Sequence, residues 1–456
     1  MSRPKPVSGF PEWLPAERIV EQHVTDTLRR VFELHGFASV ETRAVEPLDQ
    51  LLRKGEIDKE VYVLRRLQAE EGEPEPDRAK QLGLHFDLTV PFARYVLENA
   101  GKLDFPFRRY QIQKAWRGER PQEGRYREFT QADIDVIGAD TLAFHYEAEM
   151  AIVMAEVFAA LPLPPMRMQI NNRKLIEGFY RGLGADDILA VLRTVDKMDK
   201  IGPDRVRDAL VADAGLTAAQ ADACLELADI SGTDAKVADQ VRSLGVSDAG
   251  LDQGLEELVA VLDAVQGVAR DGFELIADLR IARGLDYYTG TVYETRMQGH
   301  ENIGSVCSGG RYDALATDGR TTYPGVGISL GVTRILGPLL SRGTLTASRS
   351  TPTCVLVALP DDDSRSAAES VATTLRARGI AAEVAPEASK YGKQIKFAER
   401  RGIPFVWFPQ TEAGALSSGG DEVRDIRSGE QSAADPDSWQ APTADLRPTI
   451  STAPPG

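Results

Sequence analysis

The segment from Arg283 to Glu294 concentrates side chains that could bind a small ligand. It reads Arg-Gly-Leu-Asp-Tyr-Tyr-Thr-Gly-Thr-Val-Tyr-Glu, so a cation, an acid and three tyrosines follow one another within a predicted turn and strand. Surface strands rarely carry so many aromatic and charged residues together. The composition suits a pocket that holds a small polar ligand beside an anion.

A second candidate site is the basic stretch of residues 108–127. It carries seven Lys and Arg residues against two Glu residues, whereas the whole chain has a net charge of −16. Arginine guanidinium groups bind phosphate oxygens in bidentate fashion. A solvated charged hairpin is an equally good explanation from charge alone. The next predicted strand, residues 128–137, favours a site, because alternation places Phe129, Gln131 and Asp135 on one unusually polar face.

Three weaker motifs accompany these two. Asp87 and Thr89 lie two apart on a predicted strand and would point the same way, although a surface strand end explains them as well. The glycine pair of residues 309–313 permits close backbone approach or a plain hairpin turn. The run of residues 325–331 has the spacing G-x-G-x-x-x-G, which is not a dinucleotide fingerprint. Its glycines are interpreted as packing a strand against a helix that presents Arg334.

Hydrophobic periodicity predicts the elements that would position these motifs. Strands are expected at 38–45, 106–117, 128–137 and 166–170, with a strand end at 84–91 and further strands from residue 273 onward. Helices are expected at 15–36, 92–99 and 143–161. Residues 173–270, rich in Ala, Leu and Asp, are interpreted as a helical insertion.

The end of the chain follows a different pattern. After a linker at 341–353, strands at 354–359, 381–385 and 404–408 alternate with helices at 364–379 and 393–402, which indicates a small parallel α/β domain. Residues from about 433 onward are rich in Pro, Ala, Ser and Thr and are expected to be flexible. The predicted division is therefore 1–340, 341–353, 354–432 and a tail at 433–456.

Composition restricts the class of protein. No apolar run approaches the ~18 residues of a membrane span, and the N-terminus lacks the apolar region of a secretory signal. The three scattered cysteines favour a reducing cytoplasm and no metal site. The acidic balance by itself disfavours nucleic-acid binding, although a local basic surface can oppose net charge.

Taken together, the motifs resemble those of the histidyl-tRNA synthetase family of class II aminoacyl-tRNA synthetases. Residues 116–129, followed by Gln131 and Asp135, resemble class II motif 2, and residues 327–334 resemble motif 3. The stretch beginning at Arg283 and the stretch 309–313 resemble the two histidine-specific motifs. The similarity extends over roughly residues 10–430, in the same order.

This resemblance implies an α+β class II catalytic domain on an antiparallel sheet, with a helical insertion and a C-terminal α/β anticodon-binding domain. It implies ATP-dependent activation of L-histidine and its transfer to tRNA(His), by a cytoplasmic homodimer with Mg²⁺ bound to ATP. Arg117 and Arg283 would be catalytic, against the α-phosphate. ATP would be bound by Arg117, Glu119, Arg125, Phe129 and Arg334. Histidine would be bound by Asp87, Thr89, Arg117, Gln131, Asp135, Arg283, Tyr287, Tyr288 and Tyr312.

Residues for tRNA contact are also implied. Gln122 lies in the motif 2 loop, and Lys393, Lys396 and Arg400 recur at helical spacing in the C-terminal domain. An ordinary solvated helix face explains the latter three nearly as well. The sequence departs from the family pattern at Arg43 and Ala44 in motif 1, at Thr333 in motif 3, and at His85.

An alternative function is the regulatory subunit of ATP phosphoribosyltransferase, a non-catalytic relative with the same catalytic-domain fold. Such relatives usually lack the C-terminal domain and lose the motif 2 and RGLDYY residues. Both are intact here, so the sequence favours the synthetase.

Overall fold

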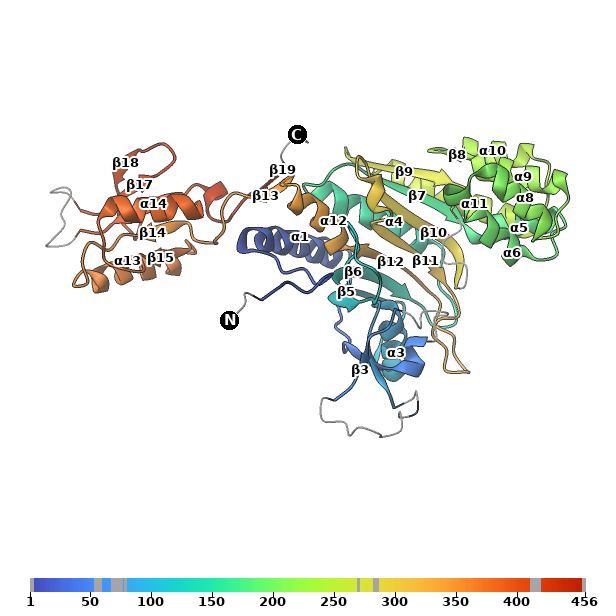
Figure 1. Ribbon diagram of the computed structural model, residues 1–456, viewed down its shortest axis with the longest axis horizontal. Helices are drawn as coiled ribbons and strands as arrows, with labels where there is room; N and C mark the ends of the chain where they lie inside the picture. Colours follow the sequence, from blue (N-terminus) through green and yellow to red (C-terminus); the bar gives the residue numbers. More distant parts are fainter. Residues whose placement is uncertain are drawn as a thin grey trace. The chain divides into compact units, whose positions relative to one another are not determined.

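The structure is a computed structural model that describes residues 4–52, 60–66, 77, 80–268, 271–281, 287–410 and 420–452. The chain divides into two compact units. The first comprises Met1–Pro11 and Val24–Pro338, and the second comprises Glu12–His23 and Leu339–Gly456. Figure 1 shows both units.

The first unit is built on a large mixed sheet, which has nine strands among the described residues. Its order is β1-β5-β6-β12-β11-β10-β7-β9-β8, and its pairs are antiparallel except β1 with β5 and β7 with β9. The strands are β1 (Ala38–Ser39), β5 (Phe107–Trp116), β6 (Glu128–Ile137), β7 (Met166–Asn172), β8 (Ser231–Gly232), β9 (Phe273–Asp278), β10 (Tyr288–Met297), β11 (Cys307–Tyr312) and β12 (Gly325–Gly331).

Helices and a small sheet flank these strands (Figure 1). The largely apolar helix α4 (His145–Ala160) buries Met150, Val153, Met154 and Val157, as expected for a helix enclosed on several sides. The other elements are α1 (Pro15–Leu34), α2 (Leu48–Leu51), α3 (Thr89–Asn99), η2 (Ala100–Lys102), η3 (Glu301–Ile303), α12 (Val332–Ser341), and a sheet of β2 (Val45–Pro47), β3 (Val63–Leu64) and β4 (Leu82–Leu84).

The region predicted as a helical insertion consists mainly of helices, which gather beyond β8 and β9 in Figure 1. Asn172, Asp187, Thr217 and Asp248 cap four of them through side-chain oxygens. The helices are α5 (Arg173–Gly182), α6 (Ile188–Val195), α7 (Met198–Ile201), α8 (Pro203–Ala212), α9 (Ala218–Asp229), α10 (Lys236–Ser243) and α11 (Ala249–Gln266).

Strand β10 contains an irregularity that shapes the sheet near the predicted ligand pocket. Its pairing with β11 shifts register between Tyr288 and Val292. The buried carboxylate of Glu147 accepts the N–H of Thr291 over 2.9 Å and pairs with Arg311 over 3.0 Å. Helix α4 therefore fixes the bulge that directs the start of β10.

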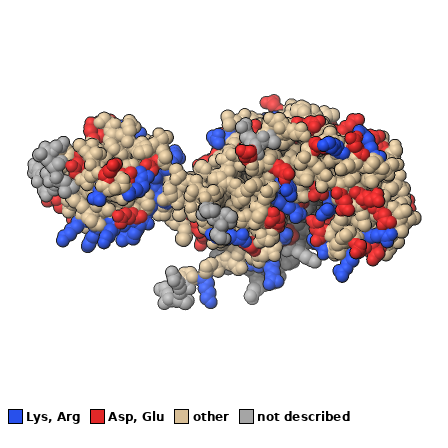
Figure 2. All heavy atoms as spheres, turned by 90° about the horizontal axis from the view of Figure 1, so that it is seen from above, with Lys and Arg blue, Asp and Glu red and all other residues tan. Residues whose placement is uncertain are grey.

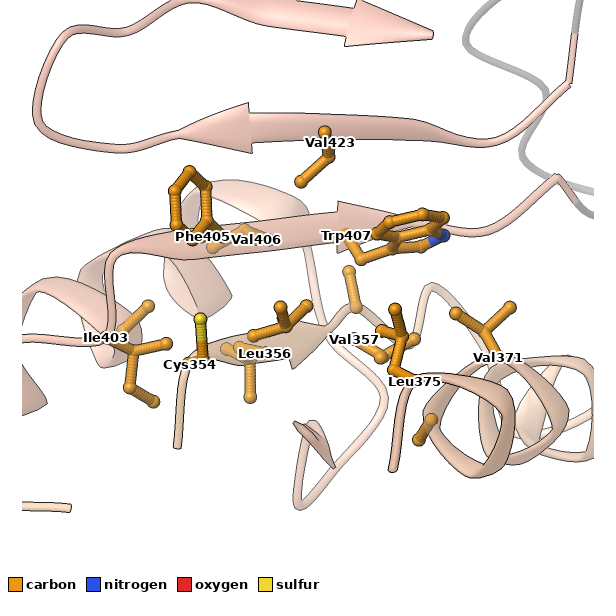
Figure 3. Close-up of a cluster of buried hydrophobic side chains, with 14 of the residues drawn as sticks. Cys354, Leu356, Val357, Val371, Leu375, Ile403, Phe405, Val406, Trp407 and Val423 are labelled. Carbon is orange, nitrogen blue, oxygen red and sulfur yellow. The ribbon is translucent and has the colours of Figure 1, made fainter. Parts of the chain in front are cut away.

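The second unit contains the predicted α/β domain. Strands β15 and β16 each pair in parallel with β14, and β17 and β18 extend the sheet as an antiparallel hairpin. The core joins residues of β14, β16 and α13, with Trp407 fully buried (Figure 3). The elements are β13 (Leu345–Ala347), β14 (Val355–Val357), α13 (Arg365–Ala377), β15 (Ala382–Val384), α14 (Tyr391–Arg401), β16 (Phe405–Phe408), β17 (Glu422–Asp425), β18 (Gln431–Ala433), η4 (Thr443–Asp445) and β19 (Ile450–Thr452).

The expectation of a flexible tail from residue 433 is wrong for residues 434–452. The indole of Trp439 packs edge-on against Phe405 and Trp407, with ring centroids 5.2 and 5.6 Å apart. Strand β19 pairs with β13, inside the predicted linker. A low density of apolar residues suggested disorder, but one partly buried tryptophan packed against the core and one strand pairing hold this segment in place.

Candidate active site

A cavity of about 410 Å³ opens on the first unit, at the ends of β6, β11 and β12. It brings together ten of the residues predicted to bind ATP or histidine, which lie far apart in the sequence. They are Asp87, Thr89, Arg117, Glu119, Arg125, Phe129, Gln131, Tyr287, Tyr288 and Arg334.

Arg117 directly follows β5, and Phe129 lies on the neighbouring strand β6. The guanidinium carbon of Arg117 lies 5.1 Å from the centre of the Phe129 ring, and its Nε donates to the carbonyl of Phe86 over 3.0 Å. About a third of the side chain remains exposed. The arginine is thus oriented by a ring and a carbonyl, and its Nη1 lies 3.9 Å from Glu119 Oε1, another lining residue.

The loop between β5 and β6 closes in a tight turn. The backbones of Gln122 and Arg125 exchange hydrogen bonds of 3.1 and 2.8 Å, and Gly124 has a positive φ of 72°. Arg125 pairs with Glu119 over 3.3 Å. Gln122 is exposed at this turn and is not part of the cavity lining.

The sequence suggested that Asp87 and Thr89 lie on one strand, but in the structure they do not. Thr89 begins helix α3, and Asp87 Oδ1 accepts the N–H of Val90 over 3.1 Å. Such a short polar residue before a helix satisfies one of its free N–H groups. Both residues still line the cavity, because the helix starts at its wall.

Two predicted histidine-binding residues, Asp135 and Tyr312, lie beneath the cavity lining. Tyr312 donates its phenolic hydrogen to Asp135 Oδ1 over 2.8 Å, and Asp135 Oδ2 pairs with the fully buried Arg109 over 2.6 Å. Burial, followed by the charge of Asp135, raises the pKa of Tyr312, so this phenol stays protonated. The cluster can therefore present fixed charge and fixed donors to a ligand above it.

The two tyrosines at the start of β10 lie side by side in the cavity. The ring centroids of Tyr287 and Tyr288 are 4.2 Å apart, and burial raises the pKa of Tyr288. Gly310 of β11 leaves room for Tyr288, since a Cβ there would lie 2.7 Å from its ring. The paired glycines are therefore part of a strand and not of a hairpin turn. Arg283 lies outside the described residues, so its predicted role stays a prediction.

Two of the three glycines of β12 have a different purpose from the one expected. A Cβ on Gly327 would lie 2.0 Å from Asp135 Oδ1, and one on Gly325 would lie 2.5 Å from the Tyr312 ring. These two make space for site residues, whereas a Cβ on Gly331 would lie 3.1 Å from the Cβ of Arg334 on α12, in line with the expected packing against a helix. The expected helix α12 does follow, and its Arg334 lines the cavity and donates to the carbonyl of Ile303 over 2.6 Å.

Two departures from the family pattern have structural explanations. Thr333 Oγ1 accepts the N–H of Thr130 over 2.8 Å and so joins α12 to β6. His85 is fully buried and donates from Nε2 to the carbonyl of Lys114 over 2.7 Å. Burial lowers the pKa of His85, so the ring stays neutral.

Sequence reasoning missed three polar groups: the buried Arg109 and Asp133, and the partly buried Ser329, which lines the cavity. Asp133 shares the polar face of β6 with Gln131 and Asp135, and this alternation was the available signal. Arg109 stood out only as one basic residue among seven. Nothing in the sequence distinguished Ser329, because its pairing with Asp133 of β6 depends on the order of strands in the sheet.

A separate hollow of about 340 Å³ lies on the second unit, between the end of β15 and α14. Lys393, Lys396 and Arg400, the three basic residues predicted at helical spacing, all line it together with Phe397. Figure 2 shows basic side chains gathered along one edge of this unit. The surface can therefore attract a polyanion in spite of the acidic net charge.

The main cavity joins fixed cations with an aromatic ring, and with a buried polar cluster that suits a small polar ligand. The sheet, the motif 2 hairpin and the α/β unit with the basic hollow together define a class II aminoacyl-tRNA synthetase. A family model described as histidyl-tRNA synthetase matches residues 9–335, and one described as an anticodon-binding domain matches residues 353–437. The chain belongs to the histidyl-tRNA synthetase family.

Curated relatives that match this chain over nearly its full length are histidine–tRNA ligases. The chain is 58% identical to the histidine–tRNA ligases of Cutibacterium acnes, over 99% of each chain, and of Micrococcus luteus, over 99% of this chain and 100% of the other. The crystal structure of histidyl-tRNA synthetase from Nostoc sp. PCC 7120 is 35% identical, with a TM-score of 0.83, and the match covers 95% and 97% of the two chains. The protein is an ATP-dependent histidine–tRNA ligase.

A more distant structure shares the fold alone. A chain from Bacillus halodurans C described as an ATP phosphoribosyltransferase regulatory subunit/histidyl-tRNA synthetase is 18% identical, with a TM-score of 0.69 and 83% of this chain covered. Because the fold is common to both functions, the full-length identity to ligases decides against the regulatory alternative. None of the helices in the described ranges is long and apolar enough to cross a membrane.

Proposed function

We propose that the 410 Å³ cavity forms histidyl-adenylate, with Arg117 as the fixed cation at the α-phosphate. A carboxylate oxygen of histidine attacks the α-phosphorus, the bond from that phosphorus to the bridging oxygen breaks, and pyrophosphate leaves. Both reactants are anions, so a held cation offsets their repulsion and stabilises the charge that develops. The support is the placement of Arg117 between the Phe86 carbonyl and the Phe129 ring.

The other residues assigned to the site divide into two groups under this proposal. At the nucleotide end, Phe129 stacks on adenine, Glu119 and Arg125 contact ATP, and Arg334 holds the leaving pyrophosphate. Arg283 provides a second cation at the α-phosphate. Histidine is bound by Asp87, Thr89, Gln131, Asp135, Tyr287, Tyr288 and Tyr312. A pocket that hydrogen-bonds its substrate rejects analogues by ~10⁴-fold or more, since these leave buried polar groups unpaired.

In the second step, a ribose hydroxyl at the 3′ end of tRNA(His) attacks the carbonyl carbon of the adenylate, and AMP leaves. We assign contacts with tRNA to Gln122 in the motif 2 turn and to Lys393, Lys396 and Arg400 of α14. Mg²⁺ enters as part of the ATP substrate, bound by its phosphates. We also propose a cytoplasmic homodimer, with catalytic and anticodon-binding domains at 1–340 and 354–432. Three buried free cysteines are compatible with a reducing compartment.

Two assays on the purified full-length chain test this function. Histidine-dependent ATP–pyrophosphate exchange reports the first step, and charging of tRNA(His) reports the second. Exchange and charging are both expected, with little exchange for other amino acids. If histidine binds but neither reaction exceeds background, the catalytic assignment is wrong and the regulatory alternative returns.

A further inference from the structure

The side chains of Gln131, Ser329 and Asp133 form a hydrogen-bond relay. Ser329 on β12 lies opposite Asp133 on β6 in the strand register. Gln131 Nε2 donates to Ser329 Oγ over 2.7 Å, and Ser329 Oγ donates to Asp133 Oδ1 over 2.5 Å. Asp133 is 2% exposed and Gln131 is 8% exposed, whereas Ser329 is partly buried and lines the cavity.

The chemistry of the relay dictates which end of the Gln131 amide faces the ligand. An ionised carboxylate can only accept, so Asp133 takes the single hydroxyl hydrogen of Ser329. The serine oxygen must then accept from an N–H group, which turns the amide nitrogen of Gln131 towards Ser329. The amide oxygen faces the other way, is buried, and has no hydrogen-bond partner among the described residues, although Gln131 itself belongs to the cavity lining.

We propose that Asp133 and Ser329 are positioning residues, which hold the oxygen of Gln131 towards the ligand while Asp133 is ionised. An N–H group of bound histidine then donates to this oxygen. When Asp133 takes up a proton, its O–H can donate to Ser329 Oγ, and the serine hydroxyl can donate to the amide oxygen. The amide of Gln131 then rotates and presents its NH₂ group to the ligand, so that this donor faces the N–H donor of histidine. This role rests on the proposed histidine-activating function of the cavity.

The environment of Asp133 places this reversal near neutral pH. Burial raises the pKa of Asp133 to about 7. The positive charge of Arg109 and the hydrogen bond from Ser329 lower this pKa, whereas the negative charges of Asp135 and Asp87 raise it. The charged and titratable groups that face Asp133 are Arg109 of β5, Asp135 of β6, Asp87 before α3, and Cys307 and Tyr312 of β11. Burial raises the pKa of Cys307 to about 12 and that of Tyr312 well above 10, so both remain neutral.

The relay predicts the direction in which KM for histidine changes with pH. Deprotonated Asp133 gives the binding-competent amide, so KM for histidine should fall as pH rises through about 7. Histidine itself titrates in this range, and a simple pH profile would mix the two effects. Dividing the KM of a variant by that of the unmodified protein at each pH cancels the ionisation of the substrate.

The experiment measures KM for histidine in pyrophosphate exchange, from about pH 5.5 to about pH 8.5, for the full-length protein and two variants. Ser329→Ala breaks the relay, and Asp133→Asn removes its titration. Both KM ratios should approach one at the acid end and rise about 5-fold at the alkaline end, the size of one neutral hydrogen bond. KM for ATP should show no such trend. Ser308→Ala, which removes a serine of β11 lining the same cavity and paired with Ser329, should give a ratio independent of pH.

Thermal unfolding checks that each variant is folded. If Ser329→Ala does not fold, the Asp133→Asn variant alone tests the relay. A ratio for Asp133→Asn that does not change with pH would overturn the relay while leaving the proposed function intact. Absence of exchange in the unmodified protein would instead overturn the proposed function. A pH trend of equal size in Ser308→Ala would show that the effect belongs to the cavity in general, and would also overturn the relay.

Discussion

Tyr312 and Asp135 meet across a strand to which neither belongs. The hydroxyl of Tyr312, on β11, donates to Asp135 Oδ1, on β6, over 2.8 Å. Strand β12 runs between them, and its Gly325 and Gly327 have no side chains to obstruct the contact. Asp135 also pairs with the buried Arg109. The proposed floor of the histidine pocket thus depends on four strands acting together.

Tyr312→Phe should weaken histidine binding without unfolding the protein. The ring remains and fills the same space, but Asp135 loses a donor, and a lost hydrogen bond to a charged group is worth about 1.5–3 kcal/mol. We expect KM for histidine in pyrophosphate exchange to rise more than 10-fold, with KM for ATP little changed. Equal rises in both constants would show that the phenol supports the whole cavity and not the amino acid site.

Gly327→Ala should damage the site severely. The added Cβ would lie 2.0 Å from Asp135 Oδ1, so the carboxylate must move away from Tyr312. Overpacking of this kind costs about 1–3 kcal/mol of unfolding free energy. Denaturant unfolding and histidine-dependent exchange should both show a loss. Gly101→Ala is the matched control, because its Cβ would meet open space, and a comparable loss there would refute this explanation.

Arg117→Ala should abolish most adenylate formation while the fold persists. Removing a preorganised group that stabilises developing charge costs ~10²–10³-fold in rate. Arg117→Lys should restore little, because lysine cannot keep both the contact with the Phe86 carbonyl and a forked donor pair in the cavity. Single-turnover adenylation measures the rate. Near-normal turnover in the lysine variant would mean that simple charge suffices.

Arg283→Ala tests the role that the family resemblance assigns to a residue outside the described ranges. We expect an intact fold, judged by circular dichroism and thermal unfolding, and loss of most single-turnover adenylation. A variant that forms adenylate at nearly the normal rate would remove Arg283 from the α-phosphate. The comparison with Arg117→Ala then shows whether one cation or two is required.

Charge reversal on α14 should affect the tRNA step alone. Replacing Lys393, Lys396 and Arg400 with glutamate puts negative charge in the basic hollow, so KM for tRNA(His) should rise about 10-fold or more at moderate salt. Pyrophosphate exchange without tRNA should not change. Arg365→Glu, on α13 of the same unit, is the control. If the control and the triple variant lose charging equally, the hollow is not the specific contact.

The sequence by itself determined the local elements and the chemistry. The bounds of β6 are those predicted, 128–137, because alternation and the flanking charged loop define a strand without help from elsewhere. The parallel pairing of the C-terminal strands also followed from their alternation with helices. The motif residues were recognisable because they match the family's motifs, and because the phosphate and imidazole binding that this resemblance implies requires particular side chains.

Strand order in the sheet decided the rest. The sequence could not show that β12 separates β6 from β11, and so it could not show that Gly327 makes room for Asp135 or that Ser329 contacts Asp133. Thr89 was misplaced on a strand because the helix start depends on the capping carboxylate of Asp87. Residue types set what the site can bind, whereas long-range pairing sets which polar groups meet and in which direction their hydrogen bonds run.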